Sequence, residues 1–288
     1  MNKPKITVIT PTYNAERDII KCIESVACQT YLPIEHLIID GGSTDSTLEL
    51  ANKYSNLKVI TEKDDGIYDA MNKGVKYASG EWIYFLGADD VLYDGAVVDN
   101  VFSAVEASCF DLIYGNVQWG DTGSVYDGRF SLLKLMQKNI CHQAIFYRAS
   151  IFKKIGNFDL NYKTWADWLF NIKCFCNDEV RRQYVDIIVA KFALGGHSSQ
   201  VIEDIDFLRD KQSIINSFFP EEYVKNEVLL QKLTLEMLQK NQQLVDQKIQ
   251  LVDLKTQIDD LKKSLSWKLT KPARVFLELI RNFNSLKK

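Results

Sequence analysis

Strand-like runs alternate with helical segments along residues 5–86 of this 288-residue chain. The runs at 5–10, 35–40 and 58–61 are short, apolar and rich in β-branched residues, and segments with helical patterns lie between them. Parallel neighbours in a sheet need a crossover connection, which is usually a helix. The alternation therefore predicts an α/β fold built on a mostly parallel, doubly wound sheet.

A further apolar run, residues 82–86, lies between Gly80 and Gly87 and is followed by Asp89 and Asp90. Its length and composition predict a buried strand. Ligands of open α/β sheets bind beyond the carboxyl ends of the strands, and carboxylate oxygens suit Mg²⁺ or Mn²⁺ on a diphosphate. We therefore predict a divalent cation (Mn or Mg) held by Asp89 and Asp90. The alternative is that both carboxylates only cap the helix that follows.

Four motifs follow one another along this part of the chain: PTYN at 11–14, DGGSTD at 40–45, GIYDAMNKG at 66–74 and LGADD at 86–90. Together they resemble family 2 glycosyltransferases of the GT-A fold, and in particular bacterial enzymes that build surface polysaccharides such as O-antigen or capsule. The resemblance covers about residues 3–205. It implies an inverting transfer of a sugar from a nucleotide sugar, usually a UDP-sugar, to a hydroxyl of a saccharide acceptor.

The resemblance also implies a donor site. Its members are Pro11, Thr12, Tyr13, Asn14, Asp40, Gly42, Ser43, Asp69, Asn72, Lys73, Asp89 and His197. In the family pattern, Asp40 hydrogen-bonds the nucleoside base and Asp89 binds the metal. The family's metal motif often reads Asp-x-Asp, whereas Gly87 takes the first of those positions here. His197, in a glycine-rich loop, is either a ligand of the diphosphate or metal or an ordinary loop histidine.

A second group of residues predicts the acceptor side. Asp167 stands among aromatic residues where family members carry an acidic residue, and it is our candidate general base; capping the helix after it is an alternative or additional role. Trp165 and Trp168 can offer a flat face to a sugar. His142 belongs to the family's His-Gln pair and either contacts a substrate or is a core histidine. We expect Asp167 to converge with the acids at 40 and 89 on one nucleotide-sized hollow.

The composition excludes some classes of protein. The formal net charge of −3 leaves no dominant basic face, which argues against a nucleic-acid-binding protein. The six cysteines include no C-x-x-C pair, so reduced thiols are expected rather than disulfides or zinc. The sequence starts without a signal-peptide pattern, and no apolar stretch is long enough to span a bilayer. We therefore expect a cytoplasmic protein.

From residue 221 onward glycine disappears and a heptad pattern begins. Apolar residues recur every seven positions at Leu230, Met237, Leu244, Leu251, Ile258 and Leu265, with Leu233, Leu254 and Leu261 three positions further on. Lys240 and Gln247 interrupt this second seam. The spacing predicts a coiled coil over 221–265 that joins copies of the chain as a dimer or a trimer. One helix folded back on its own domain would need a broader apolar stripe.

Residues 266–288 combine basic residues with apolar ones at helical spacing, which predicts a basic amphipathic helix beginning near Pro272. Such a helix would lie on an anionic membrane surface, at the inner face of the cell membrane, and would favour a lipid-linked acceptor. Docking on its own catalytic domain is the alternative. The remaining assignments are a GT-A glycosyltransferase domain at 1–205 and a linker at 206–220.

Two other functions are compatible with a nucleotide-binding α/β sheet. A sugar nucleotidyltransferase opens with a glycine-rich, arginine-containing loop after its first strand, and the PTYN segment is unlike it. A non-catalytic scaffold that assembles partners at the membrane would not need the acids at Asp89, Asp90 and Asp167. Sugar transfer is therefore the preferred prediction, while the sugar, the acceptor and the linkage depend on loop shapes that no spacing rule encodes.

Overall fold

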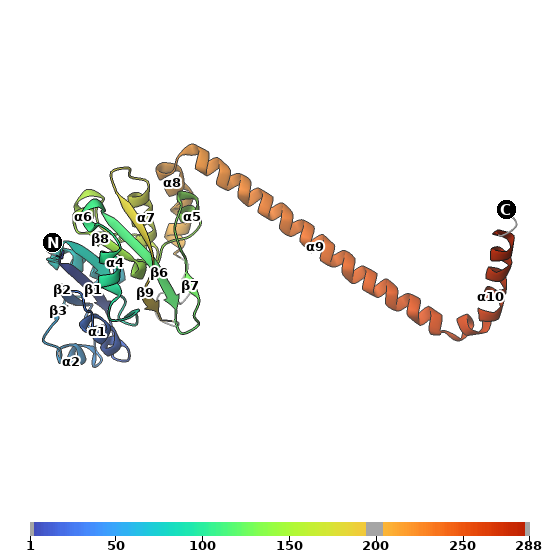
Figure 1. Ribbon diagram of the computed structural model, residues 1–288, viewed down its shortest axis with the longest axis horizontal. Helices are drawn as coiled ribbons and strands as arrows, with labels where there is room; N and C mark the ends of the chain where they lie inside the picture. The colour runs from blue at the N-terminus through green and yellow to red at the C-terminus, as the bar shows by residue number, and fades with distance from the viewer. Residues whose placement is uncertain (1–2, 194–203, 286–288) are drawn as a thin grey trace. The chain divides into compact units, whose positions relative to one another are not determined.

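The computed structural model describes residues 3–193 and 204–285, in which a nine-stranded mixed sheet is surrounded by helices (Figure 1). The strand order along the main path is β3-β2-β1-β4-β8-β6-β9-β5, and β7 pairs with β6. The chain divides into two compact units, residues 1–224 and 225–288. The predicted α/β fold is confirmed by the first of them.

The first half of the sheet is parallel and contains the strands that the alternation predicts. These are β1 (Ile6–Thr12), β2 (Ile34–Asp40), β3 (Lys58–Thr61) and β4 (Trp82–Phe85). The helices between them are α1 (Ile19–Ala27), α2 (Thr47–Ala51) and α3 (Ile67–Tyr77). Because the strands are parallel, their carboxyl ends meet at one edge of the sheet, where the candidate residues follow them.

Strand β2 is buried on both faces. Leu37 and Ile39 belong to the main core, which also contains Met71 of α3. Ile38, between them, packs in a smaller cluster with Ile23 of α1. Side chains of a strand alternate between its two faces, so one apolar run serves both layers.

The second half of the sheet is mixed, and part of it is not anticipated by the sequence analysis. Its strands are β5 (Val91–Leu92), β6 (Leu112–Trp119), β7 (Val125–Tyr126), β8 (Ile145–Arg148) and β9 (Arg182–Phe192). β8 runs antiparallel to both β4 and β6. A strand of four residues shows little periodicity, and its direction cannot be inferred from alternating strands and helices. The accompanying helices are α4 (Val97–Ser103), α5 (Leu132–Gln137), α6 (Ser150–Lys154) and α7 (Ala166–Phe175).

The residues assigned to a linker, 206–220, largely form a helix, α8 (Ile205–Phe218). Its N-cap is Asp204, whose side chain accepts a hydrogen bond from the backbone N–H of Phe207. Phe207 is fully buried and stacks on Trp168 with 5.2 Å between ring centroids. This segment is therefore a packed part of the first unit.

His36 on β2 gives a prediction for stability. The side chain is buried, its Nε2 lies 3.0 Å from Thr10 Oγ1, and burial lowers the pKa of His36 to about 3. An unfolded histidine titrates near pH 6.5, so below that pH the unfolded chain binds a proton that the folded chain does not. The stability contributed by neutral His36 is therefore present above pH 6.5 and is lost as the pH falls, by up to about 1.4 kcal/mol per pH unit.

Urea unfolding at about pH 7.5 and about pH 5 checks this. The free energy of unfolding of the wild-type protein should fall by roughly 2 kcal/mol more than that of His36→Gln over this interval. The same pH dependence in both proteins would contradict the prediction.

Helix α9 (Glu221–Lys263) is continuous over 43 residues, and the apolar side chains of its predicted seam are exposed, including Leu244 and Leu251. Helix α10 (Leu265–Ser285) contains Pro272 in its interior, so it begins about two turns earlier than the sequence analysis expects. Within the described part of the chain, no helix is both long and apolar enough to cross a bilayer. All six cysteines lie in that part and are free thiols.

Candidate active site

A cavity of about 780 Å³ lies at the carboxyl ends of β1, β2 and β4, beside the start of α3. Its lining residues are Pro11, Thr12, Tyr13, Asn14, Ala15, Asp18, Gly41, Gly42, Lys63, Asp64, Gly66, Ile67, Ala70, Gly87, Ala88, Asp89, Asp90 and His142. This is the edge of the sheet at which ligands of open α/β folds bind. The cavity is large enough for a nucleotide-sized ligand.

The loop after β1 is held to the loop after β2 by Asn14. Its Oδ1 accepts a hydrogen bond from the backbone N–H of Thr44 at 2.9 Å, and its own N–H donates to Ser43 Oγ at 2.9 Å. Asn14 has a φ of 49°, a left-handed conformation that asparagine tolerates better than most residues. Neighbouring Tyr13 is 64% exposed. Thr12, Tyr13 and Asn14 thus form one wall of the cavity.

Asp40 lies behind the cavity wall. Its side chain is fully buried, and its carboxylate accepts hydrogen bonds from the backbone N–H groups of Gly42 at 3.0 Å and Ser43 at 3.1 Å. Gly42 has a φ of 94°, which favours glycine. In the structure Asp40 therefore fixes the turn that brings Gly42 to the cavity, instead of lining the cavity itself.

The polar residues of α3 also support the wall. Lys73 Nζ lies 3.1 Å from the carboxylate of Asp69 and donates to the carbonyl of Lys63 at 2.6 Å, and Lys63 lines the cavity. Asn72 makes two hydrogen bonds to the backbone of Phe158, with its Nδ2 and its Oδ1. These three predicted donor residues hold loops in place in the structure.

Asp64 lines the cavity, although the sequence analysis does not select it. Its Oδ1 accepts a hydrogen bond from the backbone N–H of Gly66 at 3.1 Å, and its carboxylate packs so closely on Gly41 that an added Cβ there would collide with it. Burial raises the pKa of Asp64. A signal was present in the sequence, because Asp64 follows β3 much as Asp89 follows β4.

Gly87 leaves room for the two acids after β4. An added Cβ would lie 2.6 Å from Asp90 Oδ2 and 2.9 Å from Asp89 Oδ1, so a side chain at this position would displace the two carboxylates. Asp90 is buried: Gln143 Nε2 donates to its Oδ2 at 2.6 Å and the backbone N–H of Ala193 donates to its Oδ1 at 2.8 Å. Burial, with the nearby charge of Asp89, raises the pKa of Asp90 to about 6.

The donor set fits a cation shared with a ligand. Asp89 is partly exposed at the cavity, and Mg²⁺ is commonly held by one or two carboxylates plus substrate phosphates. Within residues 3–193 and 204–285, no three His, Cys, Asp or Glu side chains gather into a complete metal site. Helix capping does not explain the acids, because β5 follows them and α4 begins only at Val97.

Asp167, in the first turn of α7, is buried, and three groups are placed to donate hydrogen bonds to its carboxylate. Its Oδ1 accepts from the hydroxyl of Tyr68 at 2.7 Å and from the backbone N–H of Trp168 at 2.9 Å, and its Oδ2 accepts from Asn139 Nδ2 at 2.9 Å. It reaches the cavity through His142, whose Nδ1 lies 3.7 Å from Asp167 Oδ2. Of the three acids expected to converge, Asp89 lines the cavity and the other two lie behind its wall.

His142 opens a short 3₁₀ turn (His142–Ala144) before β8 and lines the cavity. Its side chain is 10% exposed, and its Nε2 is buried without a hydrogen-bond partner among the described residues. The side-chain Oε1 of Gln143 is likewise buried without a partner among the described residues. The backbone carbonyl of Gln143 accepts a hydrogen bond from the hydroxyl of Tyr84 at 2.8 Å. Two buried polar atoms of this turn, one of them on the lining residue His142, thus have unused bonding capacity.

The two tryptophans expected to face a sugar pack against α8. Trp168 is buried, donates from Nε1 to the carbonyl of Leu135 at 2.7 Å and stacks on Phe207. Trp165 is half-buried and meets Phe207 edge-on. The helix that covers them, α8, falls in the predicted linker. A linker there would not cover the tryptophans, so the sequence predicts that they face a sugar. His197 lies outside the described residues.

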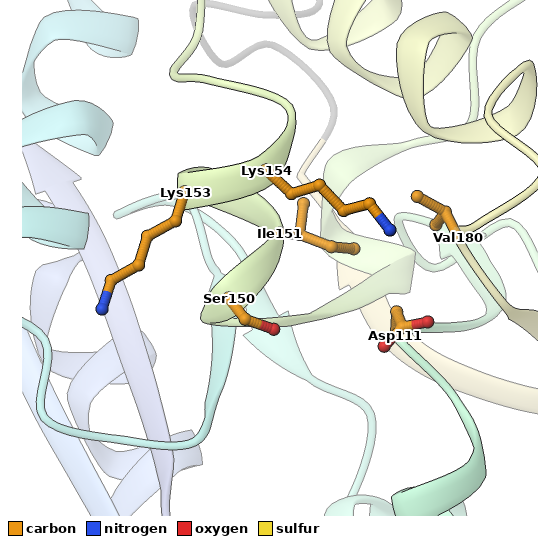
Figure 2. A pocket seen from close by; sticks show the side chains of 6 residues that line it. All are labelled: Asp111, Ser150, Ile151, Lys153, Lys154 and Val180. Atoms are coloured by element: carbon orange, nitrogen blue, oxygen red, sulfur yellow. The ribbon is translucent and has the colours of Figure 1, made fainter.

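A second hollow, of about 320 Å³, lies beside α6 and is shown in Figure 2. Two of its charged lining residues are already paired: Lys154 Nζ is 2.7 Å from Glu179 Oε2, and Asp111 Oδ2 is 3.1 Å from Arg181 Nε. This hollow therefore has fewer polar groups available to a ligand than the cavity at the strand ends.

The chain resembles known proteins in sequence. Residues 7–172 match the family model described as glycosyl transferase family 2. A PGL/p-HBAD biosynthesis glycosyltransferase of Mycobacterium tuberculosis is 41% identical over 216 residues, which cover 73% of this chain and 84% of that protein.

Two solved structures share the fold. S. aureus TarS 1–349 in complex with UDP-GlcNAc has a TM-score of 0.65 and 24% identity, over 80% of this chain and 71% of that chain. The match spans 43% of the longer TarS chain. The mannosyltransferase PcManGT from Pyrobaculum calidifontis, in complex with GDP-Man and Mn²⁺, has a TM-score of 0.57 and 18% identity, over 69% of this chain and 59% of that chain.

Proposed function

The chain belongs to glycosyl transferase family 2, and from this premise we propose that it moves a sugar from a UDP-sugar to a hydroxyl of a saccharide acceptor, with inversion at the anomeric carbon. One observation carries the proposal. A single cavity joins the loops after β1 and β2, the Asp89 carboxylate and His142, and Asp167 lies directly behind His142. The UDP-GlcNAc complex of TarS supports UDP as the nucleotide.

Two groups of residues have separate roles in the proposed reaction. Thr12, Tyr13 and Asn14 bind the nucleoside, and Asp89 faces the diphosphate. When bound there, Mg²⁺ or Mn²⁺ supplies positive charge that neutralises the leaving diphosphate. On the acceptor side, beside His142, Asp167 is the general base that removes the proton of the acceptor hydroxyl. Attack by the acceptor oxygen in one in-line displacement inverts the configuration.

Release of UDP tests the proposed reaction. The full chain, with Mn²⁺ and a panel of UDP-sugars, should release UDP from at least one of them, faster with a saccharide acceptor and not at all after chelation by EDTA. Binding without turnover for every nucleotide sugar would instead favour a non-catalytic scaffold.

We propose that the second unit gathers copies of the enzyme on a membrane that carries a lipid-linked acceptor, in the synthesis of a bacterial surface polysaccharide. Exposed apolar seam residues on α9 support a coiled coil. On α10, exposed Phe276, Leu279 and Ile280 accompany Arg274 and Arg281. Each basic residue near an anionic surface contributes about 1 kcal/mol of attraction.

Deleting residues 266–288 separates these two roles. The full chain and the truncated chain should sediment as the same oligomer, because α9 remains intact. Only the full chain should cosediment with phosphatidylglycerol vesicles, and neither should bind vesicles of phosphatidylcholine alone. Equal recovery of both proteins on anionic vesicles would contradict the membrane role, and a monomeric full chain would contradict the coiled coil.

A further inference from the structure

The carboxyl ends of β6 and β9 lie at the same edge of the sheet as the cavity. β8 runs antiparallel to both β4 and β6, so β6 runs in the direction of β4, and β9 runs parallel to β6. In the strand order, β6 and β9 lie on the far side of β4 from β1 and β2, whose loops form the proposed nucleoside site. The space for an acceptor is therefore expected beside the ends of β6 and β9.

These two strands end in an aromatic cluster that consists of Trp119, Tyr126 and Phe192. The ring of Trp119 lies 4.8 Å from that of Phe192 and 5.6 Å from that of Tyr126, between centroids, and meets both at steep angles. Its backbone is also held: the N–H donates to the carbonyl of Ser124 at 2.9 Å, and the carbonyl accepts from the N–H of Thr122 at 3.1 Å. Trp119 is half-buried, so part of a fixed indole remains accessible to a ligand.

Hydrogen bonds connect the aromatic cluster to both sides of the proposed reaction. The backbone N–H of Ala193, the residue that follows β9, donates to Asp90 Oδ1 at 2.8 Å. From the other side of the cluster, the hydroxyl of Tyr126 donates to the carbonyl of Asn139 at 2.8 Å, and Nδ2 of Asn139 donates to Asp167 Oδ2 at 2.9 Å. Both β6 and β9 also contact the 3₁₀ turn before β8. The cluster is thus fixed relative to the acids after β4 and to the proposed general base.

We propose that Trp119 is the surface on which the acceptor's sugar ring stacks; this inference rests on the proposed transferase function. A pyranose ring carries C–H groups on its face and hydroxyls at its rim. It can therefore pack its face on an indole while one hydroxyl reaches toward Asp167. The sequence analysis expects this role for Trp165 and Trp168, which pack against α8 instead.

Acceptor kinetics of the full chain test this role. The acceptors are octyl pyranosides of glucose, galactose, mannose, N-acetylglucosamine and rhamnose, used with a UDP-sugar that the wild type turns over. Trp119→Leu keeps an apolar side chain and loses the flat ring, so the KM for the accepted pyranoside should rise about tenfold. The KM for the UDP-sugar, and the slow release of UDP without an acceptor, should stay within about twofold. Trp119→Phe, which keeps a flat ring, should raise the acceptor KM by no more than about threefold.

Trp165→Leu is the matched control, because Trp165 is likewise half-buried but packs against Phe207 of α8. It should leave the acceptor KM unchanged. An unchanged acceptor KM in Trp119→Leu, or an equal rise in Trp165→Leu, would overturn the role of Trp119. If Trp119→Leu does not fold, Trp119→Met takes its place and is judged by the same values.

The wild type separates the two proposals. If it hydrolyses a UDP-sugar but none of the pyranosides accelerates the release of UDP, the stacking surface for a pyranose is wrong. A wild-type chain that turns over no nucleotide sugar at all would overturn the proposed function itself.

Discussion

Replacing Asp89 by asparagine is expected to lower kcat for sugar transfer by about 10²–10³-fold. Asp89 is the partly exposed carboxylate at the end of β4, and a divalent cation on a leaving diphosphate contributes several kcal/mol, at about 1.4 kcal/mol per tenfold in rate. Asparagine keeps the size of the side chain and removes its charge. UDP release at saturating UDP-sugar and Mn²⁺ measures the effect.

Asp121→Asn provides the matched control, because the side chain of Asp121 is fully exposed and lies in the loop between β6 and β7. It should leave kcat unchanged. A similar kcat in Asp89→Asn and Asp121→Asn would remove Asp89 from the diphosphate site.

Replacing Asp167 by asparagine is expected to reduce kcat by about 10²–10⁴-fold, with little change in UDP-sugar binding. The substitution removes the negative charge beside His142 and sets an N–H₂ group against one of the donors that Asp167 now accepts from. Single-turnover transfer measures the chemical step, and calorimetric titration with UDP measures the integrity of the donor wall.

Tyr68→Phe is the comparison variant for Asp167. It deletes one hydrogen bond to Asp167 Oδ1 and keeps the charge, so its loss should stay within about tenfold, the equivalent of one net hydrogen bond. If Asp167→Asn lost no more than Tyr68→Phe, the carboxylate would have only a structural role.

The parallel half of the sheet could be predicted because each of its strands is separated from the next by helix. The predicted bounds of β3, residues 58–61, are those of the structure. β8 could not be found this way, since its antiparallel pairing with β4 depends on residues more than sixty positions away. The linker predicted at 206–220 is mostly the helix α8, in which Phe207, Ile214 and Ile215 are buried at helical spacing, and that signal was available in the sequence.

The candidate site could also be predicted only in part. The strand-end rule located the cavity and Asp89, but it could not tell which acids would face it. Asp40 is turned inward by the backbone of the turn that follows it, and Asp167 by Tyr68, which is distant in sequence. The orientation of Asp40 thus depends on the folded shape of its own motif, and that of Asp167 on a residue 99 positions away.

The sheet also suggests how such enzymes diversify. Among residues 3–193 and 204–285, those that line the cavity precede β5 except His142, and the pairing of β4 with β8 joins the two halves. Exchanging the portion after β5 between homologues would therefore yield chimeras that retain nucleotide recognition while changing the glycan they extend. Selection that keeps the hydrogen bonds between the halves, such as those of Gln143 with Asp90 and of Tyr68 with Asp167, can change the linkage while the donor half stays the same.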